Sequence, residues 1–135
     1  MSLNRSKLRE KIMVILYQVY LYRQSGLEYN VEDIISENVE IKNDFVNDIV
    51  FGVLKEEKKL DELINKYTEN WTIDRLGKTD QAILRLSTYE LVFYDTPEVV
   101  AINEGIELAK KYSDEKIAKM VNGILDSILK EEENE

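Results

Sequence analysis

The sequence predicts an all-α fold of about seven helices. Pro97 is the only proline, and the five glycines lie far apart, so long stretches of good helix formers run without interruption. Apolar residues recur at i, i+3 and i+4 in most of these stretches, as they do in helices with one buried face. A chain of 135 residues with 44% hydrophobic content can bury the core of a single domain.

The first half of the chain is expected to hold four helices, each with an apolar stripe. The first of them ends near Gly26, and the second is short and acidic. Residues 72–77 read as a connector that can divide the chain into two helical halves. The four helices are expected at about residues 6–23, 31–36, 42–56 and 60–71.

The helix expected at residues 79–94 is apolar on nearly all sides, which is typical of a central, buried helix. Thr79 or Asp80 is its candidate N-cap. Pro97 suits the first position of the next helix, and Thr96 is expected to cap that helix. The sequence therefore predicts a sharp break between these two helices.

The last two predicted helices complete the fold. The first of them ends near Tyr112, and the second spans about residues 115–129. Four glutamates dominate residues 131–135, and such a like-charge tail is predicted to be disordered. The chain is predicted to be a single domain over residues 1–135. Its N-terminal half is expected at about residues 1–70 and its C-terminal half at about residues 71–130.

The sequence contains no cysteine and no histidine. Without cysteine there is no disulfide, thiolate zinc site or cysteine nucleophile, and without histidine the commonest general base and transition-metal ligand are missing. Carboxylate pairs such as Asp44 and Asp48 have the ordinary spacing of solvated helix faces, and no glycine-rich phosphate loop or nucleophile elbow is present. The sequence therefore predicts a protein that is not an enzyme, with no catalytic residue, metal site or cofactor.

Signals for membrane insertion and secretion are also missing from the sequence. There is no run of about 18 apolar residues, which a transmembrane helix would need. Charged residues stand near the N-terminus, where a signal peptide would be apolar. The chain is therefore expected to be cytoplasmic and to have no membrane partner.

Charge is distributed unevenly along a chain whose net charge is −9. Residues 12–135 hold 14 basic and 26 acidic side chains. Near the N-terminus a single carboxylate is opposed by four cations, Arg5, Lys7, Arg9 and Lys11. Cations in the first turns of a helix face the positive end of its dipole, which is unfavourable unless an anion binds there. We expect a cationic collar on a solvated first turn that binds nucleic-acid phosphates, the alternative being a solvated terminus without a ligand.

A second basic group lies where the last two predicted helices meet. It consists of Lys110, Lys111, Lys116 and Lys119, with Tyr112 among them. Cations that follow phosphates and rings that stack on unpaired bases suit single-stranded RNA. The alternative is that the tyrosine packs at a helix end and that neighbouring carboxylates dilute the positive charge.

Arg85 and Glu90 interrupt the apolar pattern of the central helix. Burying either charge without a partner would be costly, so each needs a partner or an opening to solvent. Glu90 is expected to pair with a polar group of the next helix, such as Glu104 or Asn103. Arg85 lies in the first half of the central helix near Asp80 and is expected to reach the surface.

Three segments carry a resemblance to a known family. They read LRLSTYEL at 84–91, VAINEGIELAK at 100–110 and VNGILD at 121–126. In their order and spacing they resemble the signature of the NusB family of bacterial transcription antitermination factors. Further similarity within residues 9–17 and 45–53 extends the resemblance over nearly the whole chain.

This resemblance implies a fold of two small helical bundles packed together. It also implies a function in antitermination, in which the protein binds the boxA element of nascent transcripts, chiefly of ribosomal RNA operons. The implied protein partner is the ribosomal protein NusE, within the antitermination complex of RNA polymerase. Some members of the family form homodimers, so a second copy of this chain is a further candidate partner.

The resemblance places RNA contacts in the basic N-terminal segment, at Arg85 and in the last helix. Ser6 and Met120 depart from the family pattern, because many members have a basic residue and some have an aromatic residue there. Together with the second basic group, the candidate RNA-binding residues are Arg5, Lys7, Arg9, Arg85, Lys116 and Lys119. The positions that face the ribosomal protein combine an aromatic anchor with carboxylates suited to a basic partner. They are Tyr17, Asp74 and Asp80.

Two other functions are compatible with the sequence. One is a module like the NusB-like RNA-binding part of ribosomal RNA cytosine methyltransferases. The other is a helical scaffold that binds protein and no RNA, which the acidic body of the chain favours.

Three polar residues of the family segments look mainly architectural, namely Asn103, Glu104 and Asn122.

Overall fold

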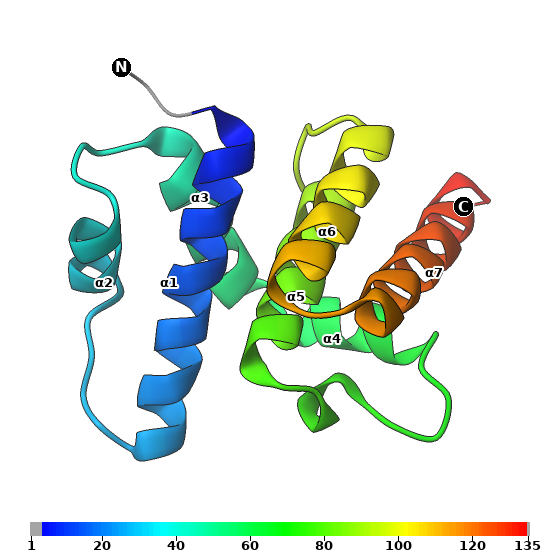
Figure 1. Cartoon of the computed structure of the whole chain (residues 1–135), viewed down its shortest axis with the longest axis horizontal. Coiled ribbons are helices and arrows are strands. Elements are labelled where there is room, and N and C mark those ends of the chain that lie inside the picture. Colours follow the sequence, from blue (N-terminus) through cyan, green and yellow to red (C-terminus); the bar gives the residue numbers. More distant parts are fainter. Residues whose placement is uncertain (1–3, 135) are drawn as a thin grey trace.

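The described residues of the chain fold into seven α-helices and one 3₁₀ turn (Figure 1). The computed structural model describes residues 4–134, and all regular structure in that range is helical. In chain order the elements are α1 (Arg5–Ser25), α2 (Val31–Asn38), α3 (Asp44–Lys55), α4 (Glu57–Asn65), η1 (Ile73–Arg75), α5 (Lys78–Val92), α6 (Glu98–Tyr112) and α7 (Glu115–Glu133). The prediction of an all-α fold is confirmed.

Short polar side chains fix the starts of four helices. Each accepts a hydrogen bond from the backbone N–H three residues further on, which satisfies one of the free donors of the first turn. The four N-cap residues, of α1, α2, α3 and α7, are Asn4, Asn30, Asn43 and Asp114. Gly26 ends α1 with φ of 70°, a left-handed conformation that glycine adopts without strain.

The predicted caps of α5 and α6 are wrong. α5 begins earlier than expected, so Thr79 and Asp80 lie within its first turn. α6 begins just after Pro97, which occupies the N-cap position itself. The hydroxyl of Thr96 instead donates to a buried carboxylate oxygen of Glu90 at 2.7 Å. A buried carboxylate needs hydrogen-bond donors, so the Thr96 hydroxyl bonds to Glu90 and does not cap α6.

The last helix extends further than the sequence predicts. α7 continues to Glu133, so most of the acidic tail is helical, while Glu135 lies outside the described residues. One carboxylate oxygen of Glu131 accepts hydrogen bonds from Lys66 Nζ and from Tyr67 Oη, both at 2.9 Å. These contacts with the segment after α4 offset the repulsion between neighbouring glutamates, which explains why the prediction of disorder is wrong for residues 131–133.

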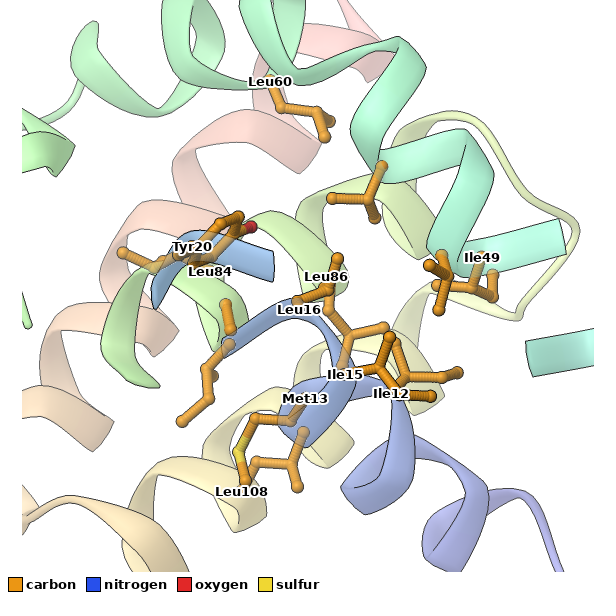
Figure 2. Packing of buried hydrophobic residues seen from close by; sticks show 14 of the residues in the cluster. Ile12, Met13, Ile15, Leu16, Tyr20, Ile49, Leu60, Leu84, Leu86 and Leu108 are labelled. Atoms are coloured by element: carbon orange, nitrogen blue, oxygen red, sulfur yellow. The ribbon is translucent and has the colours of Figure 1, made fainter. Parts of the chain in front are cut away.

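One hydrophobic core connects all seven helices, and α5 lies at its centre. α1 packs against α2, α3 and α5. α6 and α7 cover the side of α5 that faces away from α1, and α4 contacts both α5 and α7 (Figure 1). Figure 2 shows Leu84 and Leu86 of α5 among side chains of α1 such as Leu16. The apolar character of the central helix on nearly all sides follows from this position.

α6 passes very close to α5 at Gly105. A Cβ atom on this buried glycine would lie 2.5 Å from Ser87 Oγ and 3.3 Å from Leu125 Cδ1. The first of these distances is too short for any side chain unless Ser87 or one of the two helices moves. Glycine therefore sets the separation of α5 and α6, and with it the position of the lysines at the end of α6.

Candidate nucleic-acid interface

The first turns of α1 present three of the four predicted cations to solvent. Arg5, Lys7 and Lys11 are exposed, and the guanidinium of Arg5 lies 4.4 Å from the centre of the Phe45 ring. A cation held over an aromatic face is positioned without losing its charge. The predicted cationic collar is therefore present in part.

Arg9 does not belong to this collar, because it is buried with 3% of its surface exposed. Its Nε and Nη2 donate to the two carboxylate oxygens of Glu90, each at 2.7 Å, and Glu90 is 1% exposed. Nη1 lies 3.4 Å from Glu104. Burial alone would lower the pKa of Arg9, but the hydrogen bonds and charges of Glu90 and Glu104 outweigh it and raise the pKa.

The expectation that Arg9 occupies a solvated turn is therefore wrong, and so is the expected pairing of Glu90 with α6. The physical reason is the central position of Glu90, whose charge must be matched inside the protein. A fork-shaped guanidinium from α1 meets both of its oxygens, as an ammonium group would not. In sequence terms, Arg9 lies three and four residues before the buried Ile12 and Met13, so helical periodicity places it on the buried face.

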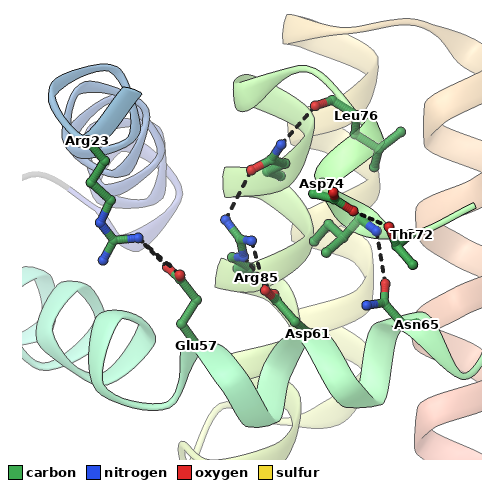
Figure 3. Close-up of polar contacts among 10 residues, drawn as sticks. Arg23, Glu57, Asp61, Asn65, Thr72, Asp74, Leu76 and Arg85 are labelled. Atoms are coloured by element: carbon green, nitrogen blue, oxygen red, sulfur yellow. Dashed lines mark hydrogen bonds and ion pairs between the residues drawn. The ribbon is translucent and has the colours of Figure 1, made fainter. Parts of the chain in front are cut away.

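Arg85 is also buried, with 6% of its surface exposed, contrary to the expectation that it reaches the surface. Figure 3 shows it pointing at Asp61 of α4, with Nε to Oδ1 at 2.7 Å and Nη2 to Oδ2 at 2.9 Å. A third donor, Nη1, lies 3.1 Å from Gln81 Oε1. Burial would lower the pKa of Arg85, but the hydrogen bond with Asp61 and the nearby phenol of Tyr20 raise it. Arg85 therefore joins α5 to α4.

The second basic group lies on the surface as the sequence predicts. Its lysines, Lys110, Lys111, Lys116 and Lys119, are all exposed, and Tyr112 is 42% exposed. Lys110 and Lys119 face an open groove of about 510 Å³ between α6 and α7. Exposed Asn103 and Asn122 line the same groove, so neither is confined to the architectural role expected for it. Amides beside lysines can hydrogen-bond to base edges or to phosphate.

Glu10 joins the two basic groups. Its Oε1 accepts hydrogen bonds from Lys111 Nζ and, at 2.7 Å, from Tyr112 Oη, while its Oε2 lies 3.4 Å from Lys7 Nζ. The hydrogen bonds from Lys111 and Tyr112, with the charges of both lysines, lower the pKa of Glu10 to about 2. The start of α1 and the end of α6 thus form one surface. No local sequence signal reveals this link, because Glu10 and Lys111 are 101 positions apart.

The predicted partner-binding residues lie on three different elements. Tyr17 is half-buried on α1, and Asp74 is exposed in η1, where it accepts a hydrogen bond from Thr72 (Figure 3). Asp80 is half-buried in the first turn of α5. A half-buried ring keeps part of its surface for a partner, and carboxylates that are at least partly exposed attract a basic partner. Their assignment to a protein interface stays a prediction.

The described residues show neither a membrane-spanning helix nor a cluster of metal ligands. No helix within residues 4–134 is both long and apolar enough to cross a membrane. In the same described part of the chain, no three His, Cys, Asp or Glu side chains are grouped so that they could hold a metal ion. The exposed cations of α1, α6 and α7 therefore form the candidate site, and we call their surface the basic surface. It is defined by Arg5, Lys7, Lys11, Lys110, Lys111, Lys116 and Lys119.

The model of the NusB family matches residues 6–130 of the chain. The chain is 40% identical to the transcription antitermination protein NusB of Clostridium kluyveri, over 96% of this chain and 97% of that protein. It is 41% identical to the protein of the same name from Bacillus licheniformis, over 93% of this chain and 96% of that protein.

Two solved structures have the same fold. NusB of T. maritima superposes with a TM-score of 0.83 at 35% identity, covering 97% of this chain and 94% of that one. A chain from a crystal structure of the antitermination factors NusB and NusE in complex with double-stranded RNA superposes with a TM-score of 0.78 at 31% identity. In that case the match covers 94% of this chain and 96% of the other.

Proposed function

Because this chain belongs to the NusB family, we propose that it is an adaptor that binds the boxA element of nascent ribosomal RNA transcripts together with the ribosomal protein NusE. The observation that carries this proposal is the shared fold with a chain from a solved complex of NusB and NusE with double-stranded RNA, at 31% identity over 94% of this chain. In this role the protein acts without catalysis, in the cytoplasm, as part of the antitermination complex of RNA polymerase.

The basic surface supplies the RNA contacts in this proposal. Arg5 and Lys7 at the start of α1 and Lys116 and Lys119 on α7 are exposed and can be reached by phosphates. Tyr112, exposed beside them, offers a ring on which an unpaired base can stack. Arg9 and Arg85 lie inside the protein and not on the basic surface. Each is buried in an ion pair, which a phosphate would have to break before it could contact the arginine.

The first prediction concerns the salt dependence of RNA binding. With NusE present, the double variant Arg5→Gln/Lys7→Gln should bind boxA RNA roughly tenfold more weakly at low salt. The slope of log K against log salt should fall by about 0.7 for each lost phosphate contact on a single strand. Fluorescence anisotropy over a range of salt concentrations measures both quantities, with a scrambled RNA as the sequence control.

The matched control for this variant removes two other exposed lysines, Lys55 and Lys58, near the junction of α3 and α4. The variant Lys55→Gln/Lys58→Gln has the same net charge as the test variant and should leave the salt slope unchanged. Equal slopes for the test variant and the wild type would show that the phosphates are held elsewhere. A folded wild type that binds NusE but does not distinguish boxA from scrambled RNA would favour the protein scaffold instead.

The second prediction concerns the protein partner. Tyr17→Ala should weaken binding of NusE by roughly tenfold or more, because aromatic anchors carry much of the energy of such interfaces. The helical circular dichroism should hardly change, since Tyr17 is only half-buried. Calorimetry measures the affinity, and Tyr22→Ala, which removes a partly exposed tyrosine from the same helix, is the control. Unchanged affinity, or unfolding of the Tyr17 variant, would contradict this assignment.

A further inference from the structure

A carboxylate occupies the centre of the basic surface. Glu10 lies on α1 between the lysines of two helices, and both of its oxygens are engaged by them. Lys111 Nζ and Tyr112 Oη meet Oε1, and Lys7 Nζ lies 3.4 Å from Oε2. A surface that binds a polyanion thus contains an anion of its own at the point where its two halves meet.

Glu10 contacts the same lysine ammonium groups that RNA phosphates would contact. Each lysine ammonium has three donors but one charge, and that charge already has a partner in the free protein. A phosphate that approaches Lys7 or Lys111 is therefore repelled by Glu10 and must compete with it for the lysines. The carboxylate is charged in the neutral range, as an ordinary glutamate is, and its contacts lower its pKa further, to about 2.

A neighbouring carboxylate does not share this position. Glu104 accepts a hydrogen bond from Ser6, and its other close contact is the buried guanidinium of Arg9 at 3.4 Å. Its charge is thus directed toward the protein interior, while the charge of Glu10 is directed toward the exposed lysines. Among the carboxylates that contact the start of α1, Glu10 is the one placed to compete with a bound strand.

We propose that Glu10 is an internal competitor of RNA, which occupies Lys7 and Lys111 in the free protein and thereby limits the affinity of the basic surface for phosphates. This inference rests on the function proposed above, since it requires that RNA binds to the basic surface. Glu10 acts through the two lysines and needs no contact with RNA itself. It lowers the affinity for every sequence alike, so it makes the protein depend more strongly on base contacts and on its protein partner.

The variant Glu10→Gln tests this proposal. Glutamine keeps the shape of the side chain and an oxygen that can accept hydrogen bonds from Lys111 and Tyr112, but it removes the charge. Binding of boxA RNA and of scrambled RNA should both become roughly two- to fivefold tighter at low salt, the scale of an exposed ion pair. The salt slope should become steeper by up to about 0.7, because one more cation is available to a phosphate.

The matched control is Glu57→Gln. Glu57 also pairs with a cation of α1, Arg23 in the last turn, at 2.9 Å, and its replacement changes the net charge by the same amount. The double variant Glu10→Gln/Lys111→Gln shows whether the effect passes through Lys111. In that case the gain in affinity from Glu10→Gln should be smaller in the Lys111→Gln protein than in the wild type. Thermal unfolding of each variant checks that it is folded.

The outcomes separate this inference from the proposed function. Tighter binding and a steeper slope for Glu10→Gln, with no change for Glu57→Gln, would support the inference. Equal gains for both variants would show a general effect of net charge, and weaker binding would show that Glu10 organises the surface, so either result would overturn it. If the folded wild type binds no RNA even with NusE present, the proposed function fails first.

Discussion

Arg9→Leu should lower the free energy of unfolding by about 3–5 kcal/mol, because it leaves the buried carboxylate of Glu90 without its cation. Glu90 is 1% exposed and would retain the hydroxyl of Thr96 as its remaining close donor. Urea unfolding followed by circular dichroism measures the change as a lower midpoint with a similar slope.

Two controls separate the ion pair from other effects of this substitution. Lys130→Leu also replaces a cation by leucine, but in an exposed pair with Asp126, and should change the free energy of unfolding by less than about 0.5 kcal/mol. The double variant Arg9→Leu/Glu90→Leu should recover much of the loss, because neither charge of this buried pair remains. A loss below about 1 kcal/mol for the single variant would contradict the structure of this pair.

Gly105→Leu should lower the free energy of unfolding by about 3 kcal/mol, because its side chain has no space between α5 and α7. Ser87 Oγ and Leu125 Cδ1 lie 2.5 Å and 3.3 Å from the position of the first added carbon. α6 would have to move away from α5, which would also displace Lys110 and Lys111. Chemical unfolding measures the loss of stability, and RNA titration under folding conditions measures the displaced lysines.

Gly123 provides the matched control on α7. It is exposed in the helix, and a Cβ atom there would have no neighbour within 4 Å. Gly123→Leu should therefore stabilise the protein by about 0.5–1 kcal/mol, since leucine favours a helix more than glycine does. Opposite signs for the two substitutions are expected, and a similar loss at both positions would show that close approach of α5 and α6 is not the cause.

The helices and the core are largely predictable from the sequence, because both follow from local periodicity. The central position of α5, for example, is visible in its apolar character on nearly all sides. The helix ends are less predictable where tertiary contacts decide them. Thr96 bonds to Glu90 rather than to a helix end, and Glu131 gains a cation and a hydroxyl that no local pattern reveals.

The candidate site is predictable in its charges but not in its arrangement. Clusters of lysine and arginine show where cations gather along the chain, and most of them do lie on the surface. The exceptions are Arg9 and Arg85, whose partners Glu90 and Asp61 are 81 and 24 positions away. Pairing over such distances depends on how the helices pack. For the same reason the sequence reveals no link between Glu10 and the end of α6.

The packing of α1 against α5 has a consequence for the order in which the chain can fold during synthesis. α1 leaves the ribosome before its central partner α5, which follows only after three intervening helices. The apolar face of α1 therefore remains without this partner until α5 has emerged, whereas α5, α6 and α7 follow one another directly and meet through short loops. During that interval the part of α1 that α5 later covers is exposed to chaperones and to aggregation, and packing of α1 onto α5 ends this exposure.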